Sequence, residues 1–116
     1  METKTSGNTG EVLAENFLKK KGYLVLERNF STKIGEIDLI CRDKDYIVFV
    51  EVKTRTSNRF GYPREAINFA KQQKIRKTAQ IYLKMKHLFD VDCRFDCVEV
   101  LGDKEECEIE HYIDAF

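Results

Sequence analysis

The sequence predicts a single α/β domain in which helices flank a mixed β-sheet. Three observations indicate this class: a helical apolar pattern at 10–21, β-type alternation at 35–42 and 46–55, and a second, longer helical pattern at 64–87. The 116 residues lie within the usual range for one domain with one core. We therefore treat residues 1–116 as one domain and expect the polar residues 1–9 to be flexible.

The first predicted element is a helix over residues 10–21. Its apolar residues recur at helical spacing: Val12, Leu13, Phe17 and Leu18. Gly22 follows three lysines and is expected to end the helix, because glycine readily adopts the left-handed conformation of a C-terminal cap. A short apolar strand is then expected at 23–26.

Two alternating segments predict a β-hairpin. In residues 35–42, Ile37, Leu39 and Cys41 share one face. In residues 46–55, three valines, at 48, 50 and 52, share one face, and Ile47, Phe49, Glu51 and Lys53 share the other. The polar residues 43–45 between the two segments are typical of a turn.

The second half of the chain predicts a loop, a helix and two strands. The loop covers 56–63 and contains the single proline, Pro63. The helix covers 64–87, and two strands follow at 94–101 and 108–113. The predicted helix has an apolar stripe: Ala66, Ile67, Ala70, Ile75, Ala79, Tyr82 and Leu83. The complete order is αβββαββ.

Charge is unevenly distributed along a chain whose net charge is zero. Residues 64–86 contain seven basic residues and one acidic residue, whereas residues 88–116 contain ten acidic residues and two basic ones. Such separation can present a basic face to an anionic polymer. An ordinary solvated helix followed by acidic edge strands explains the same pattern, and composition alone leaves both interpretations open.

Composition also bounds the environment of the protein. Hydrophobic residues make up 42% and charged residues 34%, which suits a soluble globular fold. No apolar run approaches the roughly 20 residues that span a membrane, and the N-terminus lacks a secretory apolar segment. The four cysteines (Cys41, Cys93, Cys97 and Cys107) form no CxxC pair and are expected to be reduced thiols. We therefore expect a cytoplasmic protein with no membrane partner.

Charged residues inside the predicted hairpin indicate a functional site. Glu51 and Lys53 lie in the most β-prone run of the chain, where an unpaired buried charge would cost several kcal/mol. If Asp38 lies opposite Glu51, the residue numbers of each pair sum to 89, and Glu36 then lies opposite Lys53. Carboxylates directly opposite on antiparallel strands have Cβ atoms about 4.5–5.5 Å apart and repel one another unless a cation intervenes.

Two explanations of these charges stay open at this point. A pair of carboxylates provides the hard oxygen ligands that Mg²⁺ or Mn²⁺ prefers, with water in the remaining positions. Alternatively, Glu36 and Lys53 form a cross-strand ion pair on a solvated sheet face, and the other carboxylates are simply exposed.

The motifs GEIDLI (35–40) and VFVEVKTR (48–55) resemble the D…ExK core of the PD-(D/E)XK phosphodiesterase superfamily. More narrowly, the chain resembles the YraN-like family of predicted bacterial endonucleases over nearly its whole length. The matching segments are GNTGEVLAENFL (7–18), KGYLVLERNF (21–30), GYPREAINFAKQQKI (61–75), RFDCVEV (94–100) and the terminal IDAF. A similar order and spacing occurs in archaeal Holliday-junction resolvases. The resemblance implies a restriction-endonuclease-like αβββαβ(β) core.

The resemblance also implies roles for individual residues. Asp38, Glu51 and the backbone carbonyl of Val52 would bind Mg²⁺ or Mn²⁺, and Lys53 would orient the attacking water. Glu11 matches an extra carboxylate near the metal, although a favourable charge at the N-terminus of a helix also explains it. Residues expected to contact nucleic acid are Arg55, Arg59, Lys71 and Lys74.

These roles predict a metal-dependent endonuclease that hydrolyses phosphodiester bonds in DNA. Such an enzyme could be selective for DNA structure, such as junctions or branches. We expect DNA before RNA as the polymer, and a homodimer is one possible assembly. The alternative is a nucleic-acid-binding or partner-recruiting module that keeps a nuclease fold but has little activity of its own.

Overall fold

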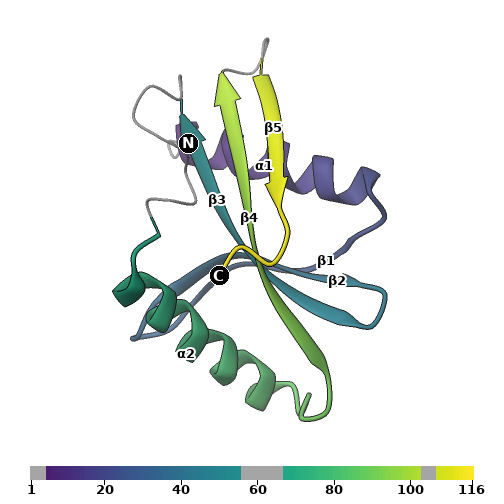
Figure 1. Cartoon of the computed structure of the whole chain (residues 1–116), viewed down its shortest axis with the longest axis vertical. Helices are drawn as coiled ribbons and strands as arrows, with labels where there is room; N and C mark the ends of the chain where they lie inside the picture. The colour runs from purple at the N-terminus through teal and green to yellow at the C-terminus, as the bar shows by residue number, and fades with distance from the viewer. Residues whose placement is uncertain (1–4, 56–66, 103–106) are drawn as a thin grey trace.

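The computed structural model describes residues 5–55, 67–102 and 107–116 (Figure 1). The elements in chain order are α1 (Thr5–Lys20), β1 (Leu24–Ser31), β2 (Glu36–Asp43), β3 (Tyr46–Arg55), α2 (Phe69–Met85), β4 (Asp92–Gly102) and β5 (Cys107–Tyr112). This is the predicted order. The strands form one mixed sheet in the order β1-β2-β3-β4-β5, in which β3 and β4 are parallel and the other pairs are antiparallel.

One helix covers each face of the sheet (Figure 1). Helix α1 packs through Ala14 and Leu18 on the face that carries Val48 and Val50. Helix α2 packs on the opposite face, which includes Phe49. The predicted alternation of β3 is therefore confirmed, and so is the α/β class with a mixed sheet flanked by helices. Among the described residues, neither helix has the length and apolar character needed to cross a membrane.

The end of α1 follows directly from its sequence. Gly22 has φ of 98°, its N–H donates to the carbonyl of Lys19 (2.9 Å), and the N–H of Tyr23 donates to the carbonyl of Leu18 (3.0 Å). These two bonds form a Schellman cap, which needs a residue without a Cβ at the left-handed position. The predicted stop at Gly22 is confirmed, and Tyr23 packs with Leu18 in the same core cluster.

The helix beginnings differ from the prediction. Helix α1 begins at Thr5, so residues 5–9, which were expected to be flexible, are helical. Helix α2 begins at Phe69 rather than at residue 64, because Asn68 is extended (ψ 174°) and its side chain accepts a hydrogen bond from the N–H of Lys71. Ala70, assigned to the inner stripe, is exposed. Residues 64–66 lie outside the described residues.

Strand β1 is longer than predicted, and an irregularity in its pairing explains why the sequence pattern ended early. The prediction ended at residue 26, whereas β1 continues to Ser31. The register with β2 shifts between Val25 and Glu27, as in a β-bulge. A bulge puts the two halves of a strand out of phase, so the apolar alternation of the first half does not continue and the second half has no visible period.

The hairpin of β2 and β3 has the predicted register. Pairs from Asp43↔Tyr46 to Leu39↔Val50 all have numbers that sum to 89. The paired region ends at Leu39↔Val50, so the further pairs expected for Asp38 and Glu36 are not part of the ladder. Ile37 also leaves the predicted face and joins the α2-side cluster. Beyond the last pair, the side chain of Asp38 accepts a hydrogen bond from β3 in place of the backbone, as described below.

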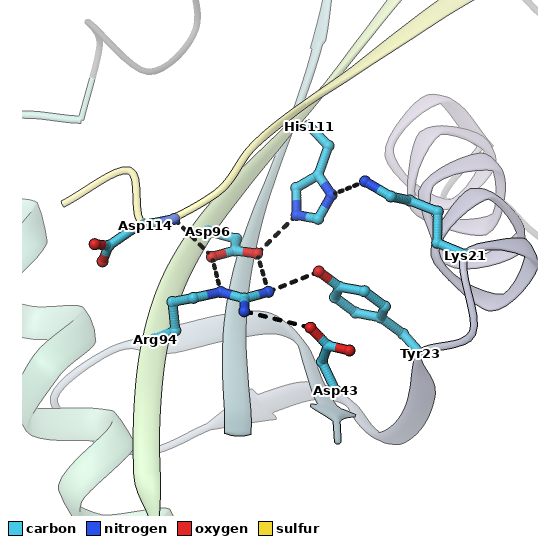
Figure 2. A network of polar contacts seen from close by, with 7 residues as sticks. All are labelled: Lys21, Tyr23, Asp43, Arg94, Asp96, His111 and Asp114. Atoms are coloured by element: carbon cyan, nitrogen blue, oxygen red, sulfur yellow. Dashed lines mark hydrogen bonds and ion pairs between the residues drawn. The ribbon is translucent and has the colours of Figure 1, made fainter. Parts of the chain in front are cut away.

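A buried polar network lies on the α1 side of the sheet (Figure 2). At its centre Asp96, which is fully buried, accepts two hydrogen bonds from Arg94 (3.0 Å each), one from the N–H of Asp114 (2.9 Å), and lies 2.7 Å from Nε2 of His111. The network continues to the segment after α1 through the contacts of Lys21 with His111 (2.8 Å) and of Arg94 with Tyr23 (2.6 Å). It reaches the end of β2 through the contact of Arg94 with Asp43 (3.3 Å).

This network ties the C-terminal end of the chain to the sheet. Burial by itself would raise the pKa of Asp96, but the hydrogen bonds from His111, Arg94 and the N–H of Asp114 hold this pKa below its usual value. A carboxyl whose pKa is lowered in the native state contributes stability at neutral pH, and that contribution disappears as the pH falls through the native pKa.

We predict that Asp96→Asn lowers the free energy of unfolding at pH 7 by about 3 kcal/mol, because an amide cannot satisfy four donors. The difference should narrow as the pH falls below about 4 and through the lower native pKa of Asp96, because the wild-type carboxyl then becomes neutral as well. Urea unfolding at several pH values would measure both effects. The exposed Asp92→Asn on the same strand is the control and should change stability by less than about 0.5 kcal/mol. A loss in Asp96→Asn that does not depend on pH would contradict the electrostatic explanation.

Close packing of α1 against β3 depends on Gly10. A Cβ at this position would lie 2.0 Å from Cγ2 of Thr54, far inside contact distance. We predict that Gly10→Ala lowers the free energy of unfolding by about 1–3 kcal/mol, despite the better helix propensity of alanine. Because serine lacks Cγ2, Thr54→Ser should restore most of the loss in the double variant. A double variant as unstable as Gly10→Ala would show that another contact is responsible.

Candidate functional site

A cleft of about 470 Å³ opens between the sheet and α2, on the face opposite the polar network. It lies where β2 and β3 stop pairing, next to the first turns of the helix. The lining residues are Ile34, Gly35, Glu36, Asp38, Glu51, Asn68, Ala70, Lys71, Lys74 and Ile75. Three carboxylates and two lysines therefore share a small space at the end of a hairpin.

Asp38 is held at this site by the backbone of the neighbouring strand. Its Oδ2 accepts a hydrogen bond of 2.8 Å from the N–H of Val52, just beyond the last pair of the β2–β3 ladder. The side chain thus replaces the backbone acceptor that a continued ladder would have provided. In an extended strand the N–H and C=O of one residue point to the same side, so the Val52 carbonyl is directed toward the Asp38 side as well.

Glu51 is a buried carboxylate held between two lysines. Its side chain is only 7% exposed. Oε2 lies 2.7 Å from Nζ of Lys71 and 3.4 Å from Nζ of Lys53, so both ammonium groups contact the same oxygen. Lys53 belongs to the same strand, whereas Lys71 reaches the carboxylate from α2. The charges that looked anomalous in a central strand are therefore partnered across the sheet–helix boundary.

Asp38 and Lys53 have pKa values shifted away from their charged forms, whereas the pKa of Lys71 is raised because its contact with Glu51 outweighs the opposing effect of burial. Burial and then the nearby Glu51 carboxylate raise the pKa of Asp38 to about 7, against the opposing effect of the Val52 N–H. Burial and the neighbouring Lys71 lower the pKa of Lys53, and Glu51 only partly opposes them. Groups with perturbed pKa values in a cleft are typical of functional sites.

Glu11 lies near this pair of carboxylates but is not gathered with it into one cluster. Its carboxylate adds to the repulsion that raises the pKa of Asp38, and its Oε1 accepts a hydrogen bond of 3.0 Å from the Asn29 side chain. Glu15, one turn further on, is engaged elsewhere by hydrogen bonds from the Arg28 guanidinium and an ion pair with Lys19 (3.0 Å). Of the two helix carboxylates, Glu11 remains the candidate near the site.

A hard divalent cation fits the donor groups at this site. The described residues contain no group of three or more His, Cys, Asp or Glu side chains arranged for a metal. The carboxylates of Asp38 and Glu51 and the Val52 carbonyl are all oxygen donors, which would suit Mg²⁺ or Mn²⁺ with water completing the shell. The contact of an ammonium group with Glu51 also shows that this position accepts a cation.

The structure describes only some of the basic residues that were considered as contacts for nucleic acid. Lys71 and Lys74 both line the cleft, as expected of residues near a bound polymer. Arg59 and the side chain of Arg55 lie outside the part of the chain that the structure describes. The guanidinium of Arg76, a member of the basic stretch, lies over the Phe95 ring at 4.7 Å from its centroid, so this charge makes a cation–π contact beside the α2-side cluster.

Sequence reasoning missed two features of the site. The first is the ion pair of Lys71 with Glu51, since no local pattern links residues 20 positions apart on different elements. The second is Gly35, where a Cβ would lie 3.2 Å from Oγ1 of Thr78 and 3.5 Å from Cβ of Lys74. This close approach brings the β1–β2 turn against α2 and forms one wall of the cleft.

Comparison with known proteins identifies the family. The model of an uncharacterised protein family, UPF0102, matches residues 10–100, which include every residue that lines the cleft. The chain is a member of UPF0102. It is 52% identical to a UPF0102 protein of Caldanaerobacter subterraneus subsp. tengcongensis, over 97% of this chain and 95% of that protein. A UPF0102 protein of Syntrophomonas wolfei is 49% identical, over 95% of this chain and 96% of its own length.

Membership in UPF0102 confirms the family-level part of the resemblance. The UPF0102 protein of Acetivibrio thermocellus is 51% identical, over 92% of this chain and 83% of the relative. The names of these UPF0102 proteins state no activity, so the chemistry of the cleft must be inferred from its own residues.

The raised pKa of Asp38 predicts an unusual pH dependence of stability. The native state binds a proton that the unfolded state, with an Asp pKa near 3.9, has lost, so stability falls as the pH rises from about 4 to about 7. Asn can still accept the hydrogen bond from Val52. Asp38→Asn should therefore raise the free energy of unfolding by about 2 kcal/mol at pH 8, and by much less at pH 4.

Urea unfolding in a chelator at pH 4, 6 and 8 would measure this difference. The exposed turn residue Asp45 provides the control Asp45→Asn, which should change stability by less than about 0.5 kcal/mol. An Asp38→Asn variant no more stable than the wild type at pH 8 would refute the interpretation that burial and Glu51 disfavour the ionised form of Asp38.

Proposed function

We propose that this chain is a metal-dependent nuclease of the PD-(D/E)XK superfamily that hydrolyses phosphodiester bonds in DNA. The observation that carries the proposal is that Asp38 and Glu51 line one cleft and that Nζ of Lys53 lies 3.4 Å from Oε2 of Glu51. These are the three side chains of the D…ExK motif. The mixed sheet flanked by helices is consistent with the restriction-endonuclease-like core that such a site requires.

Asp38, Glu51 and the Val52 carbonyl would hold Mg²⁺ or Mn²⁺, with Glu11 reaching it through water. When bound, the cation would lower the pKa of a water molecule and polarise the scissile phosphate. The raised pKa of Asp38 implies that cation binding releases a proton from this carboxyl near neutral pH.

Lys53 would position the attacking water and stabilise charge on the phosphate. Its ammonium group lies 3.4 Å from Oε2 of Glu51, and its side chain is 27% exposed, so it is held beside this carboxylate and is still accessible to solvent. In the hydrolysis the attacking water loses one proton to solvent and its oxygen bonds to phosphorus, while one P–O bond to the sugar breaks. The leaving oxygen takes a proton from solvent, and Lys53 supplies the positive charge where negative charge develops.

The polymer would be held by cationic groups beside the cleft. Lys71 and Lys74 lie on the first turns of α2, a helix without acidic residues in its sequence. Arg55 and Arg59 follow the catalytic strand in sequence and are proposed as further phosphate contacts. We propose DNA before RNA, with branched or junction DNA as the first substrates to test, and a homodimer as the assembly that would cut symmetric junctions.

A second candidate function is a nucleic-acid-binding or recruiting module with little activity. It is favoured by one observation, the ion pair that places the Lys71 ammonium on Glu51. The two candidates differ in whether a divalent cation and Lys53 support turnover.

The proposed nuclease predicts cleavage of a labelled panel that contains a four-way junction, a flap, a nicked duplex, single-stranded DNA and RNA, in Mg²⁺ or Mn²⁺. Glu51→Gln and Lys53→Met should each reduce the rate at least about 100-fold, because each removes a charged group needed in the transition state. Lys53→Met should keep most of its affinity for Mn²⁺.

Two exposed residues provide matched controls, Glu108→Gln on β5 and Lys44→Met in the β2–β3 turn, and both should cleave at the wild-type rate. Tight binding of the panel without cleavage under any condition would favour the recruiting module. Full activity of Lys53→Met would remove this lysine from the mechanism.

A further inference from the structure

Lys71 occupies an unexpected position for a residue that grips a polymer. Its ammonium group lies 2.7 Å from Oε2 of Glu51, so its charge is directed at a carboxylate rather than at solvent. The side chain is 40% exposed, whereas that of Glu51 is 7% exposed. Lys71 is therefore an accessible cation that covers a buried anion.

The backbone of Lys71 is fixed while its side chain can reorient. Asn68 caps α2 by accepting a hydrogen bond of 2.8 Å from the N–H of Lys71, which places this residue in the first turn at the edge of the cleft. The lysine side chain is a flexible chain of four carbons that ends in an ammonium group. This group can therefore leave Glu51 without any movement of the helix. Lys53, the other partner, lies on the same strand as Glu51 and is less exposed.

A divalent cation and Lys71 would bind the same carboxylate, that of Glu51. A bound Mg²⁺ or Mn²⁺ approaches a carboxylate oxygen to about 2.0–2.2 Å, and an ammonium group in contact with that oxygen would repel it. The carboxylates of Asp38 and Glu51 line the same cleft, so the pair benefits from a cation of either kind.

We infer that Lys71 and the divalent cation compete for Glu51, so that entry of the cation releases the Lys71 ammonium group to bind a phosphate of the substrate. This inference rests on the proposed function and adds a coupling between its two ligands. The released charge stays in a cleft of about 470 Å³ that Lys74 also lines, where a phosphate of the polymer would meet both lysines. Binding of the cation then favours binding of the polymer, and by linkage the reverse holds to the same extent.

The test measures Mn²⁺ alone, without nucleic acid, by isothermal titration calorimetry. Lys71→Gln should bind Mn²⁺ about tenfold more tightly than the wild type, because the competing cation is gone. Lys74→Gln is the matched control, since it removes the same charge from the same cleft but Lys74 is not an ion-pair partner of Glu51 in the described part of the chain. Its affinity should change less than about threefold.

A second variant guards against a loss of folding in Lys71→Gln. Lys71→Arg keeps a cation on Glu51, and a guanidinium can bind a carboxylate through two hydrogen bonds. Its affinity for Mn²⁺ should equal that of the wild type or be lower. Melting temperatures in a chelator would verify that each variant is folded.

The possible results separate this inference from the proposed function. Tighter binding in Lys71→Gln than in Lys74→Gln supports the competition, and so does binding that appears only in Lys71→Gln. Wild-type binding with no gain in Lys71→Gln over Lys74→Gln overturns the competition and leaves the proposed nuclease site intact. If the wild type and both glutamine variants fail to bind Mn²⁺, the metal site of the proposed function fails and the competition fails with it.

Discussion

The hydrogen bond from the N–H of Val52 to the Asp38 side chain determines how the rest of the cleft is arranged. It ends the β2–β3 ladder after Leu39↔Val50, so β3 continues beside β4 alone while β2 diverges. This divergence opens space for solvent and side chains in a sheet that is otherwise covered on both faces. It also brings a second carboxylate beside Glu51 and directs the Val52 carbonyl to the same side. The side chain of Asp38 thereby accounts for three features: the end of the β2–β3 pairing, the pair of carboxylates, and the Val52 carbonyl directed to the same side.

The two glycine contacts keep the helices close enough to complete this arrangement. Gly10 allows α1 to approach Thr54, which follows Lys53 on β3, and the next residue of that helix, Glu11, acts electrostatically on Asp38. Gly35 allows the β1–β2 turn to approach α2 on the other face, where Lys71 reaches Glu51. A methyl group would clash with Cγ2 of Thr54 at Gly10, and at Gly35 it would make a tight contact with Oγ1 of Thr78. Backbone proximity therefore controls the electrostatics of the site.

Much of the fold was predictable because local chemistry determines it. The Gly22 cap, the β3 alternation and the register of the hairpin all follow from neighbouring residues, and each is confirmed. The predicted start of α2 was wrong because the side chain of Asn68 caps the helix, although the helical apolar pattern begins earlier in the sequence. The length of β1 was wrong because a bulge hides its period. Proximity of the D…ExK residues could be predicted from the register, whereas the contact of Lys71 with Glu51 depends on how α2 docks, which no local pattern encodes.

The carboxylates of Asp96 and Asp38 have opposite environments, and the contrast indicates which of the two is available for chemistry. Asp96 accepts bonds from Arg94, His111 and a backbone N–H, so its pKa is lowered and its charge is satisfied on the α1 face. Asp38 accepts one backbone bond and faces Glu51, so its pKa is raised to about 7. A satisfied carboxylate gains little from a metal ion, whereas a carboxylate that repels its neighbour gains a great deal. The same physical rule thus assigns Asp96 to stability and makes Asp38 and Glu51 the pair that a cation would stabilise.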